Sequence, residues 1–225
     1  MHPFDVETLT AGRWRNGGGA TRVIVSWPAG AEEFRWRASV ADIDRDGPFS
    51  AFPGVDRTFT LLAGDGVRLT APGAFDRTVR AGEPFGFSGD LELTAELRGG
   101  ACRVLNIMVR RGVRAARVER VTGPVVPPFG HAGVLYVLRG AWRTEAEGHT
   151  LATGQGVWWD EPRGHAAVEE GERGRDERAG SADRARAREA IRTRAEPRHE
   201  TAPGRAVTPL SPEAVALWAD VAPVR

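Results

Sequence analysis

Lysine is absent from this sequence, and cysteine is almost absent. All 31 basic side chains are arginine, and Cys102 is the only thiol. A single cysteine excludes an internal disulfide and a cysteine-rich metal site. Codon bias in a GC-rich genome best explains the missing lysines, so selection for bidentate anion contacts can apply only to particular arginines. A role in anion binding therefore needs separate support for each arginine.

A large net charge of either sign is missing as well. The formal net charge is +1, which gives no preference for nucleic acid or for an anionic membrane. The first residues, Met1–Asp5, have neither the basic region nor the apolar region of a signal peptide. No apolar run is long enough to span a bilayer. We therefore expect a soluble, cytoplasmic protein that binds neither nucleic acid nor membranes.

Helical periodicity of useful length is absent before Ala179. Instead, short strands follow one another between glycine-rich turns. Residues 34–43 alternate with period two, which puts Arg37 and Ser39 on one face and Trp36 on the other. The predicted strands are Val6–Leu9, Thr21–Trp27, Phe34–Ile43, Arg57–Leu62, Val67–Thr70, Asp76–Arg80, Phe85–Phe87, Leu91–Leu97, Val104–Val109, Gly133–Leu138, Ala141–Thr144, Val157–Trp159 and Ala206–Leu210. This spacing favours an all-β sandwich or barrel.

Two stretches interrupt the strand pattern of the second half. Gly112–Pro128 is a connector rich in Arg, Val and Pro, and Glu169–Arg205 consists mainly of Arg, Glu, Asp, Ala and Gly. The second stretch has too few apolar side chains to offset an ordering cost of about 1–2 kcal/mol per residue, so we expect a mobile, disordered insertion. Near the end of the chain, Ser211 and Pro212 predict a short capped helix that runs through Trp218.

Two segments near the N-terminus are denser in aromatic, arginine and glycine residues than a simple core requires. The first, Trp14–Thr21, contains Asn-Gly-Gly-Gly, and Asn-Gly predicts a hairpin turn because both central residues of that turn favour positive φ. The second, Phe34–Arg57, contains Trp-Arg-x-Ser, Asp-Gly-Pro-Phe-Ser and Phe-Pro-Gly. Together these motifs resemble the HutD/Ves family of bicupins, and a looser resemblance continues to about Gly112.

The resemblance implies a bicupin, which consists of two cupin-like β-barrels of the jelly-roll type. We expect the better-formed barrel at residues 1–112 and a smaller one at 113–225, with the mobile insertion at about 169–205. A weak internal repeat between Phe59–Val67 and Leu135–Arg143 agrees with this expectation. The resemblance also implies a link to histidine utilisation, as a regulator of that pathway rather than as an enzyme of it.

The family's pattern can be transferred only to the positions that match it. The matching residues are Trp14, Asn16, Gly17, Gly18, Trp36, Arg37, Ser39, Gly47, Phe49, Ser50, Phe52, Gly54, Arg57, Asn106 and Arg110. One departure concerns the residue before the Leu-Asn pair, where the family has Asp and this chain has Val104. The ligand of this chain can therefore differ from that of its relatives.

Polar residues within these motifs predict an anion site. Arg37 and Ser39 share a strand face, as do Asn106, Met108 and Arg110. Guanidinium groups pair their N–H donors with two carboxylate oxygens, so a small carboxylate is the natural ligand. The candidate ligand-binding residues are Trp14, Asn16, Gly17, Gly18, Trp36, Arg37, Ser39, Phe49, Ser50, Phe52, Arg57, Asn106, Met108 and Arg110.

Catalytic motifs are poorly matched. Ser39 and Ser50 have no accompanying histidine and no nucleophile-elbow sequence, and Cys102 is more simply a buried, inert thiol. The glycines 17–19 form no phosphate loop and act as a hairpin turn or a pocket wall. We therefore predict no catalytic residue and no cofactor, and the leading function is non-catalytic binding of a small acid metabolite.

Two other functions stay open, as does a homodimer. The first is a metal-free cupin isomerase or hydrolase that acts on a small carboxylate. Its acid–base group would have to be Asp42, Asp44, Asp46 or Asp56. The second is a structural or interaction module whose barrel holds no ligand.

Stoichiometric metal is predicted to be absent, because the histidines lack ligand spacing. A metal-binding cupin has two histidines separated by one residue, then a glutamate, and a further histidine near the next hairpin. Here the histidines are scattered, at His2, His131, His149, His165 and His199. Elemental analysis of untagged protein should find far less than one equivalent of zinc, iron, manganese or nickel. A value close to one equivalent would contradict the prediction.

Overall fold

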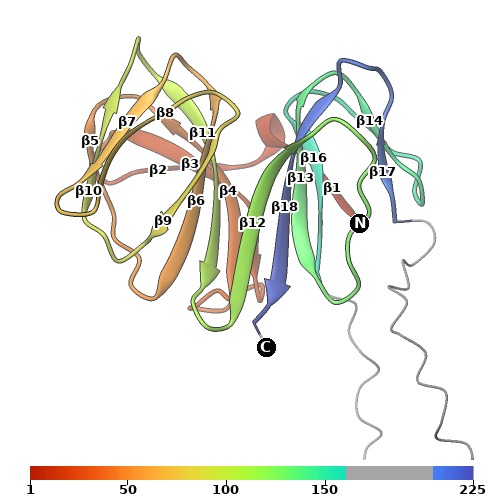
Figure 1. The fold of residues 1–225 in the computed structure, drawn as a ribbon, viewed down its shortest axis with the longest axis horizontal. Coiled ribbons are helices and arrows are strands. Elements are labelled where there is room, and N and C mark those ends of the chain that lie inside the picture. The colour runs from red at the N-terminus through yellow and green to blue at the C-terminus, as the bar shows by residue number, and fades with distance from the viewer. Residues whose placement is uncertain (161–204, 225) are drawn as a thin grey trace, which may run out of the picture.

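The computed structural model describes residues 1–160 and 205–224 (Figure 1). Strands dominate this part of the chain, which confirms the predicted all-β fold. No helix within it has the length and the apolar character needed to cross a bilayer. The predicted insertion at about 169–205 lies outside the described residues, except for Arg205.

The first half of the chain forms two sheets that face each other. The six-stranded sheet has the antiparallel order β2-β3-β4-β11-β6-β9, and the four-stranded sheet has the order β5-β10-β7-β8. Their strands are β2 (Ala11–Arg13), β3 (Gly19–Trp27), β4 (Trp36–Ile43), β5 (Gly47–Phe49), β6 (Val55–Ala63), β7 (Val67–Ala71), β8 (Phe75–Val79), β9 (Pro84–Ser88), β10 (Leu93–Leu97) and β11 (Cys102–Arg110). Phe59, Leu61 and Leu69 are buried between the two sheets.

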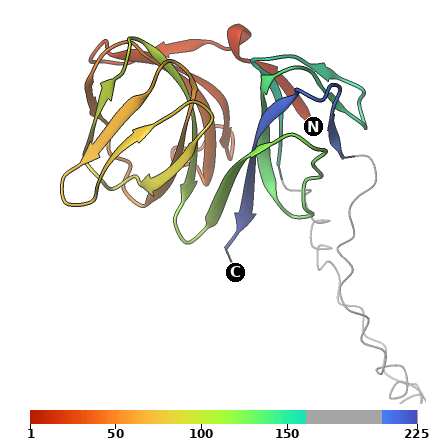
Figure 2. The same ribbon diagram turned by 45° about the horizontal axis from the view of Figure 1, so that its top comes forward.

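The second half forms a five-stranded sheet with the order β1-β16-β13-β18-β12 and a three-stranded sheet with the order β15-β14-β17. Their strands are β1 (His2–Asp5), β12 (Arg114–Val121), β13 (Ala132–Arg139), β14 (Trp142–Thr144), β15 (Thr150–Leu151), β16 (Gln155–Trp159), β17 (Val207–Pro209) and β18 (Val215–Pro223). Strand β1 pairs with β16, so the start of the chain joins a sheet of the second half, and Figure 2 shows this segment running between the two halves.

Aromatic side chains fill the interior of the second half. Trp142, Trp159 and Trp218 are buried there, and the rings of Trp159 and Trp218 stack with their centroids 4.7 Å apart. A β-carbon at position 133 would collide with the ring of Trp159 and with the carbonyl oxygen of Ala219. Gly133 therefore lets β13 approach both groups closely.

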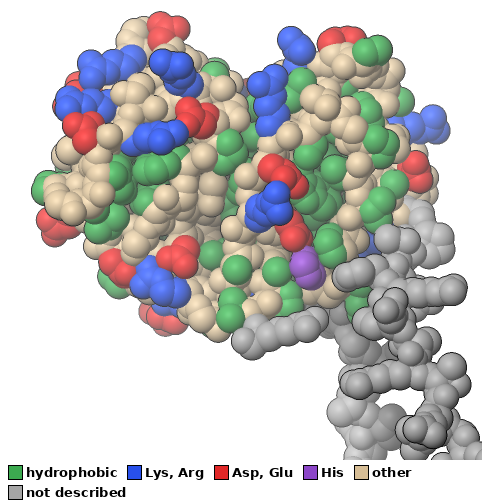
Figure 3. Space-filling view, viewed as in Figure 1, with side chains coloured by type: hydrophobic (Ala, Val, Ile, Leu, Met, Phe, Trp, Pro, Cys, Tyr) green, Lys and Arg blue, Asp and Glu red, His purple; other side chains and the backbone are tan. Residues whose placement is uncertain are grey.

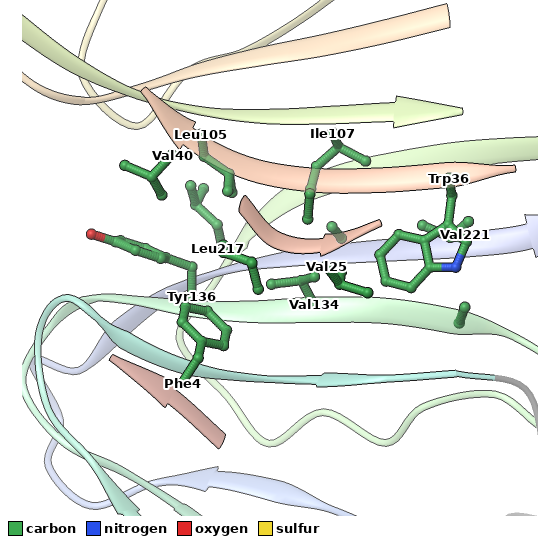
Figure 4. Close-up of a cluster of buried hydrophobic side chains, with 14 of the residues drawn as sticks. Phe4, Val25, Trp36, Val40, Leu105, Ile107, Val134, Tyr136, Leu217 and Val221 are labelled. Atoms are coloured by element: carbon green, nitrogen blue, oxygen red, sulfur yellow. The ribbon is translucent and has the colours of Figure 1, made fainter. Parts of the chain in front are cut away.

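The six-stranded and five-stranded sheets pack against each other through a central core (Figure 4). Its members include Trp36, Val40, Leu105 and Ile107 from the first half and Phe4, Val134, Tyr136, Leu217 and Val221 from the five-stranded sheet. Because side chains alternate along a strand, β4 and β11 direct every second residue into this core. The residues between them project into the first half, so both faces of β4 and β11 are covered.

A cluster of charged side chains lies beside the central core. The Asp42 carboxylate accepts hydrogen bonds from Arg22 and from Arg103, whose Nε lies 2.6 Å from Asp42 Oδ1. Arg103 also donates to Glu7, which belongs to the 3-10 helix Val6–Thr8. Burial raises the pKa of Asp42, but the hydrogen bonds from Arg103 and Arg22 outweigh burial and hold this pKa below its ordinary value.

Local structure differs most from the sequence prediction in three places, and the short strands β1, β2 and β5 were not predicted either. The predicted helix through Trp218 is the strand β18, which pairs with β13 and β12 along its edges. One face of β18 is buried in the central core and the other in the interior of the second half, and this burial overrides helix propensity. The predicted strand Val6–Leu9 is a 3-10 helix, in which the Asp5 side chain caps Glu7 N at 2.9 Å. The predicted connector at 112–128 contains β12, which pairs with β18 along its full length.

Acid should remove the stabilisation that Asp42 provides. Because the pKa of Asp42 is lower in the folded than in the unfolded chain, its contribution is complete above the unfolded pKa of about 3.9 and is lost as the pH falls through the folded pKa. Urea unfolding should therefore show wild type more stable than Asp42→Asn at about pH 6, with the difference shrinking towards about pH 2. A difference independent of pH would contradict this role.

Candidate ligand-binding site

An open cavity of about 690 Å³ lies inside the first half, between the six-stranded sheet and the segment that carries β5. Strand alternation explains its position, since the cavity receives those residues of β4 and β11 that the central core does not take. Most of the predicted site residues line it, namely Trp14, Asn16, Arg37, Ser39, Phe49, Ser50, Phe52, Arg57, Asn106 and Met108.

Strand register brings the two arginines of the site onto one row. Met108 on β11 lies opposite Arg37 on β4 and opposite Arg57 on β6, and directly paired residues project from the same face. At the usual strand spacing the two arginine Cα atoms are roughly 10 Å apart. Asn106 and Ser39 are paired in the next row of the cavity face. An amide and a hydroxyl therefore accompany the two guanidinium groups.

Arg57 is buried among aromatic rings. Its guanidinium carbon lies 5.6, 5.3 and 5.2 Å from the ring centroids of Phe49, Phe52 and Phe87. Its Nη2 donates to Asn106 Oδ1 at 3.1 Å, whereas its Nε is buried without a hydrogen-bond partner among the described residues. Burial lowers the pKa of Arg57 to about 10, so the guanidinium stays charged at neutral pH. The rings fix this charge at the cavity wall.

Arg37, like Arg57, forms no ion pair with an acidic side chain of residues 1–160 or 205–224. Burial lowers its pKa, and its Nε also has no hydrogen-bond partner in the described part of the chain. As far as the structure describes it, the cavity lining contains Arg13, Arg15, Arg37 and Arg57 but no Asp or Glu. Buried cations need a counter-charge, so this wall is suited to an anion supplied by a ligand.

The β2–β3 hairpin forms one rim of the cavity. Trp14 donates through Nε1 to Thr21 Oγ1 at 2.8 Å, and its ring meets Phe49 edge-on at 6.2 Å between centroids. A β-carbon at Gly19 would collide with the carbonyl oxygen of Asp42, so the glycine allows β3 to lie close to β4. Asn16 Oδ1 accepts a hydrogen bond from Gly18 N at 2.9 Å. The hairpin thereby fixes Trp14 at the cavity mouth.

The turn that carries Phe52 forms the opposite rim. Phe52 N donates to Gly89 O at 2.7 Å, and Gly54 N donates to Asp90 Oδ1 at 2.7 Å. Arg111 Nη1 donates to the same carboxylate, 2.7 Å from Asp90 Oδ2. These contacts lie outside the cavity and hold the Phe52 ring over the guanidinium of Arg57.

Four predicted site residues do not line this cavity. Trp36 is fully buried in the central core, because it alternates with Arg37 along β4 and points to the other face of the sheet. Arg110 is at the end of β11, where it pairs with Glu33 at 3.2 Å. Gly17 occupies the hairpin turn with φ 67°, and Gly18 borders an adjoining hollow of about 280 Å³.

Sequence reasoning also missed residues of the site. The additional lining residues are Thr10, Gly12, Arg13, Arg15, Thr21, Val23, Ala41, Ile43, Pro48 and Val104. The alternation of side chains along β3 and β4 could have placed Thr21, Val23, Ala41 and Ile43 on the cavity face. No local signal indicates that Phe87 stacks on Arg57, because that contact results from pairing between β6 and β9.

None of the four aspartates considered for acid–base catalysis lines the main cavity. Asp42 points away from it towards Arg103, and Asp44 lies 3.9 Å from Arg13. Asp56 pairs with Arg111, whereas Asp46 borders the smaller hollow and accepts a hydrogen bond from Leu97 N. Among residues 1–160 and 205–224, no group of three or more His, Cys, Asp or Glu side chains is arranged to hold a metal.

A family model described as HutD matches residues 6–174. This chain belongs to the HutD family. Protein Ves of Citrobacter koseri is 42% identical over 161 residues, which cover 71% of this chain and 83% of the relative. Protein Ves of Cronobacter sakazakii is 38% identical over 162 residues, which cover 72% and 88%. The resemblance stated from the sequence motifs is confirmed.

Solved structures support the cupin-like fold of this HutD-family protein. HutD from Pseudomonas fluorescens SBW25 superposes with a TM-score of 0.69 at 21% identity, covering 99% of this chain and 98% of the other. A cupin 2 conserved barrel domain protein from Leptotrichia buccalis gives a TM-score of 0.50 at 10% identity, covering 99% and 96%. At these identities the likeness shows the fold alone.

Cys102 should react slowly with thiol reagents. The side chain is buried, and burial, together with the charges of Asp42 and Asp44, raises the pKa of this thiol to about 12. Only the thiolate is nucleophilic, so its population at about pH 8 is very small. Labelling with a disulfide reagent should be at least about tenfold slower in native than in urea-unfolded protein. Equal rates would show that the thiol is exposed.

Proposed function

We propose that this protein binds a small carboxylate in the cavity of its first half and does not transform it. The observation that carries the proposal is the pair Arg57, which is buried, and Arg37, which is half-buried, neither of which has an acidic partner among the described residues of the cavity lining. Guanidinium groups present paired N–H donors that match the two oxygens of a carboxylate. A bound carboxylate would supply the missing counter-charge.

The dimensions of the cavity agree with a metabolite-sized ligand. A volume of about 690 Å³ falls within the range of roughly 300–1,000 Å³ typical of small-molecule sites. Arg37, Arg57 and Asn106 supply polar contacts, whereas Ala41 and Ile43 supply apolar surface. This combination suits an acid with a compact apolar body.

The chemistry of the cavity wall supports binding rather than catalysis. Among the described residues, the lining contains no Asp, Glu, His, Cys or Tyr, and these are the usual general acids and bases. Its hydroxyl groups, including those of Ser39 and Ser50, have no base beside them in the lining. Val104, at the position where the family's pattern has Asp, contributes an apolar side chain to the wall.

Membership of the HutD family supports a regulatory setting for this binding. The resemblance of the motifs links the family to histidine utilisation, and we propose that the ligand is an acid of that pathway whose binding is sensed. The related HutD of Pseudomonas fluorescens was solved in a formate condition, and formate is the smallest carboxylate.

A thermal-shift screen with small carboxylic acids, followed by calorimetric titration, tests the proposal. Arg57→Gln should weaken binding of the best acid roughly tenfold to a hundredfold, because a charge-assisted hydrogen bond contributes about 1.5–3 kcal/mol. Arg37→Gln should weaken it similarly. Arg77→Gln is a matched control, since Arg77 lies on β8 outside the cavity and pairs with Glu83.

Three outcomes would contradict the proposal in different ways. If no acid binds the wild type at millimolar concentration, the binding function is wrong and the empty-barrel alternative takes its place. Equal affinity in a folded Arg57→Gln variant would remove Arg57 from the site. If chromatography shows that the wild type converts an acid into a product, the enzyme alternative is favoured.

A further inference from the structure

Strand β12 is an unusually long sheet edge. It contains eight residues, and within the described chain it pairs only with β18. The other edge strands of the four sheets, β1, β2, β5, β8, β9, β15 and β17, contain between two and five residues. Short edges limit unwanted pairing with other chains, and β12 lacks this protection.

Proline and bulges are missing from β12 too, and the charged side chains that it carries are the protective device that it retains. The sequence Arg-Ala-Ala-Arg-Val-Glu-Arg-Val contains no proline or glycine, and its register with β18 runs without a bulge. Proline and bulges are common means of ending a sheet at an edge. In Figure 1 β12 is at the front of the molecule between the two halves, and Figure 3 shows charged side chains among apolar ones on the middle of that face.

We propose that β12 pairs antiparallel with β12 of a second copy of this chain, about a two-fold axis at Val118. A two-fold axis perpendicular to the sheet keeps each residue on its own face, so the axis must pass through a residue position. With Val118 at the axis, Arg117 of each copy lies opposite Glu119 of the other. Ala116 then lies opposite Arg120, and no like charges face each other.

Charge decides between this register and its neighbours. Moving the axis to Arg117 or to Glu119 would place that residue opposite its own copy, and like charges directly opposite destabilise a strand pair. Arg117 and Glu119 are accessible, with side-chain exposures of 80% and 44%, and they pair within one chain at 3.1 Å. The same two charges can therefore exchange partners when two edges meet.

The resulting dimer would join two five-stranded sheets into one continuous sheet. Its interface is formed by the second half of each chain, whereas the cavity lies within the first half, on the opposite side of the six-stranded sheet. The proposed interface and the cavity therefore share none of the described lining residues. The inference does not rest on the proposed function, and either can fail without the other.

Sedimentation velocity on the full chain tests the pairing. The wild type should be a dimer at about 100 µM, a concentration at which a complex of micromolar affinity is largely formed. Because positions 117 and 119 face each other at two symmetric places in the dimer, Arg117→Glu alone or Glu119→Arg alone creates two pairs of like charges. Each of these substitutions should weaken dimerisation roughly tenfold to a hundredfold. The double variant Arg117→Glu/Glu119→Arg restores opposite charges and should dimerise as the wild type does.

Controls separate this interface from general effects of charge. Arg143→Glu on β14 changes the net charge equally at an exposed site outside β12 and should leave the dimer unchanged. Thermal unfolding of each variant should match that of the wild type. A monomeric wild type at this concentration overturns the proposal. So does a dimer that both single substitutions leave intact, or a double variant that stays as weak as the single ones.

Discussion

The structure depends on two strands, β4 and β11, whose side chains are needed on both faces. One face of each strand contributes Trp36, Leu105 and Ile107 to the core between the halves, and the other face contributes Arg37 and Asn106 to the cavity. A slip of one residue in either strand would exchange these two sets. The same register that stabilises the contact between the sheets therefore positions the polar groups of the site.

The candidate site is organised around the charge of Arg57, which no acidic side chain of the described residues neutralises. Taking an arginine out of water costs free energy, and in most proteins a nearby carboxylate compensates for it. Around Arg57 the compensation consists of three phenylalanine rings and one amide oxygen. Elsewhere in the same half, Asp42 and Asp90 are fully engaged with arginines. Acidic groups are thus present in number but are kept off the cavity wall.

The sequence predicted the parts of this arrangement that depend on local pattern. Alternation over residues 34–43 correctly separated Arg37 and Ser39 from Trp36, so including Trp36 among the site residues contradicted the very pattern on which the prediction rested. The all-β fold and the hairpin at Asn16-Gly17 also followed from short-range signals. Contacts across strands did not: Phe87 meets Arg57 only because β9 pairs with β6. In the same way, β18 is a strand because the central core buries one of its faces and the interior of the second half buries the other.

The interior of the second half is filled by the rings of Trp142, Trp159 and Trp218, whereas the first half contains an open cavity. A close-packed body of large rings changes shape little, because every displacement must move a neighbour. The back of the six-stranded sheet connects the cavity to this body, since Trp36 and Leu105 meet the side chains of β13 and β18 there. A displacement of β4 or β11 at the cavity wall would therefore also displace the side chains that pack against the second half, because both faces of these strands are covered.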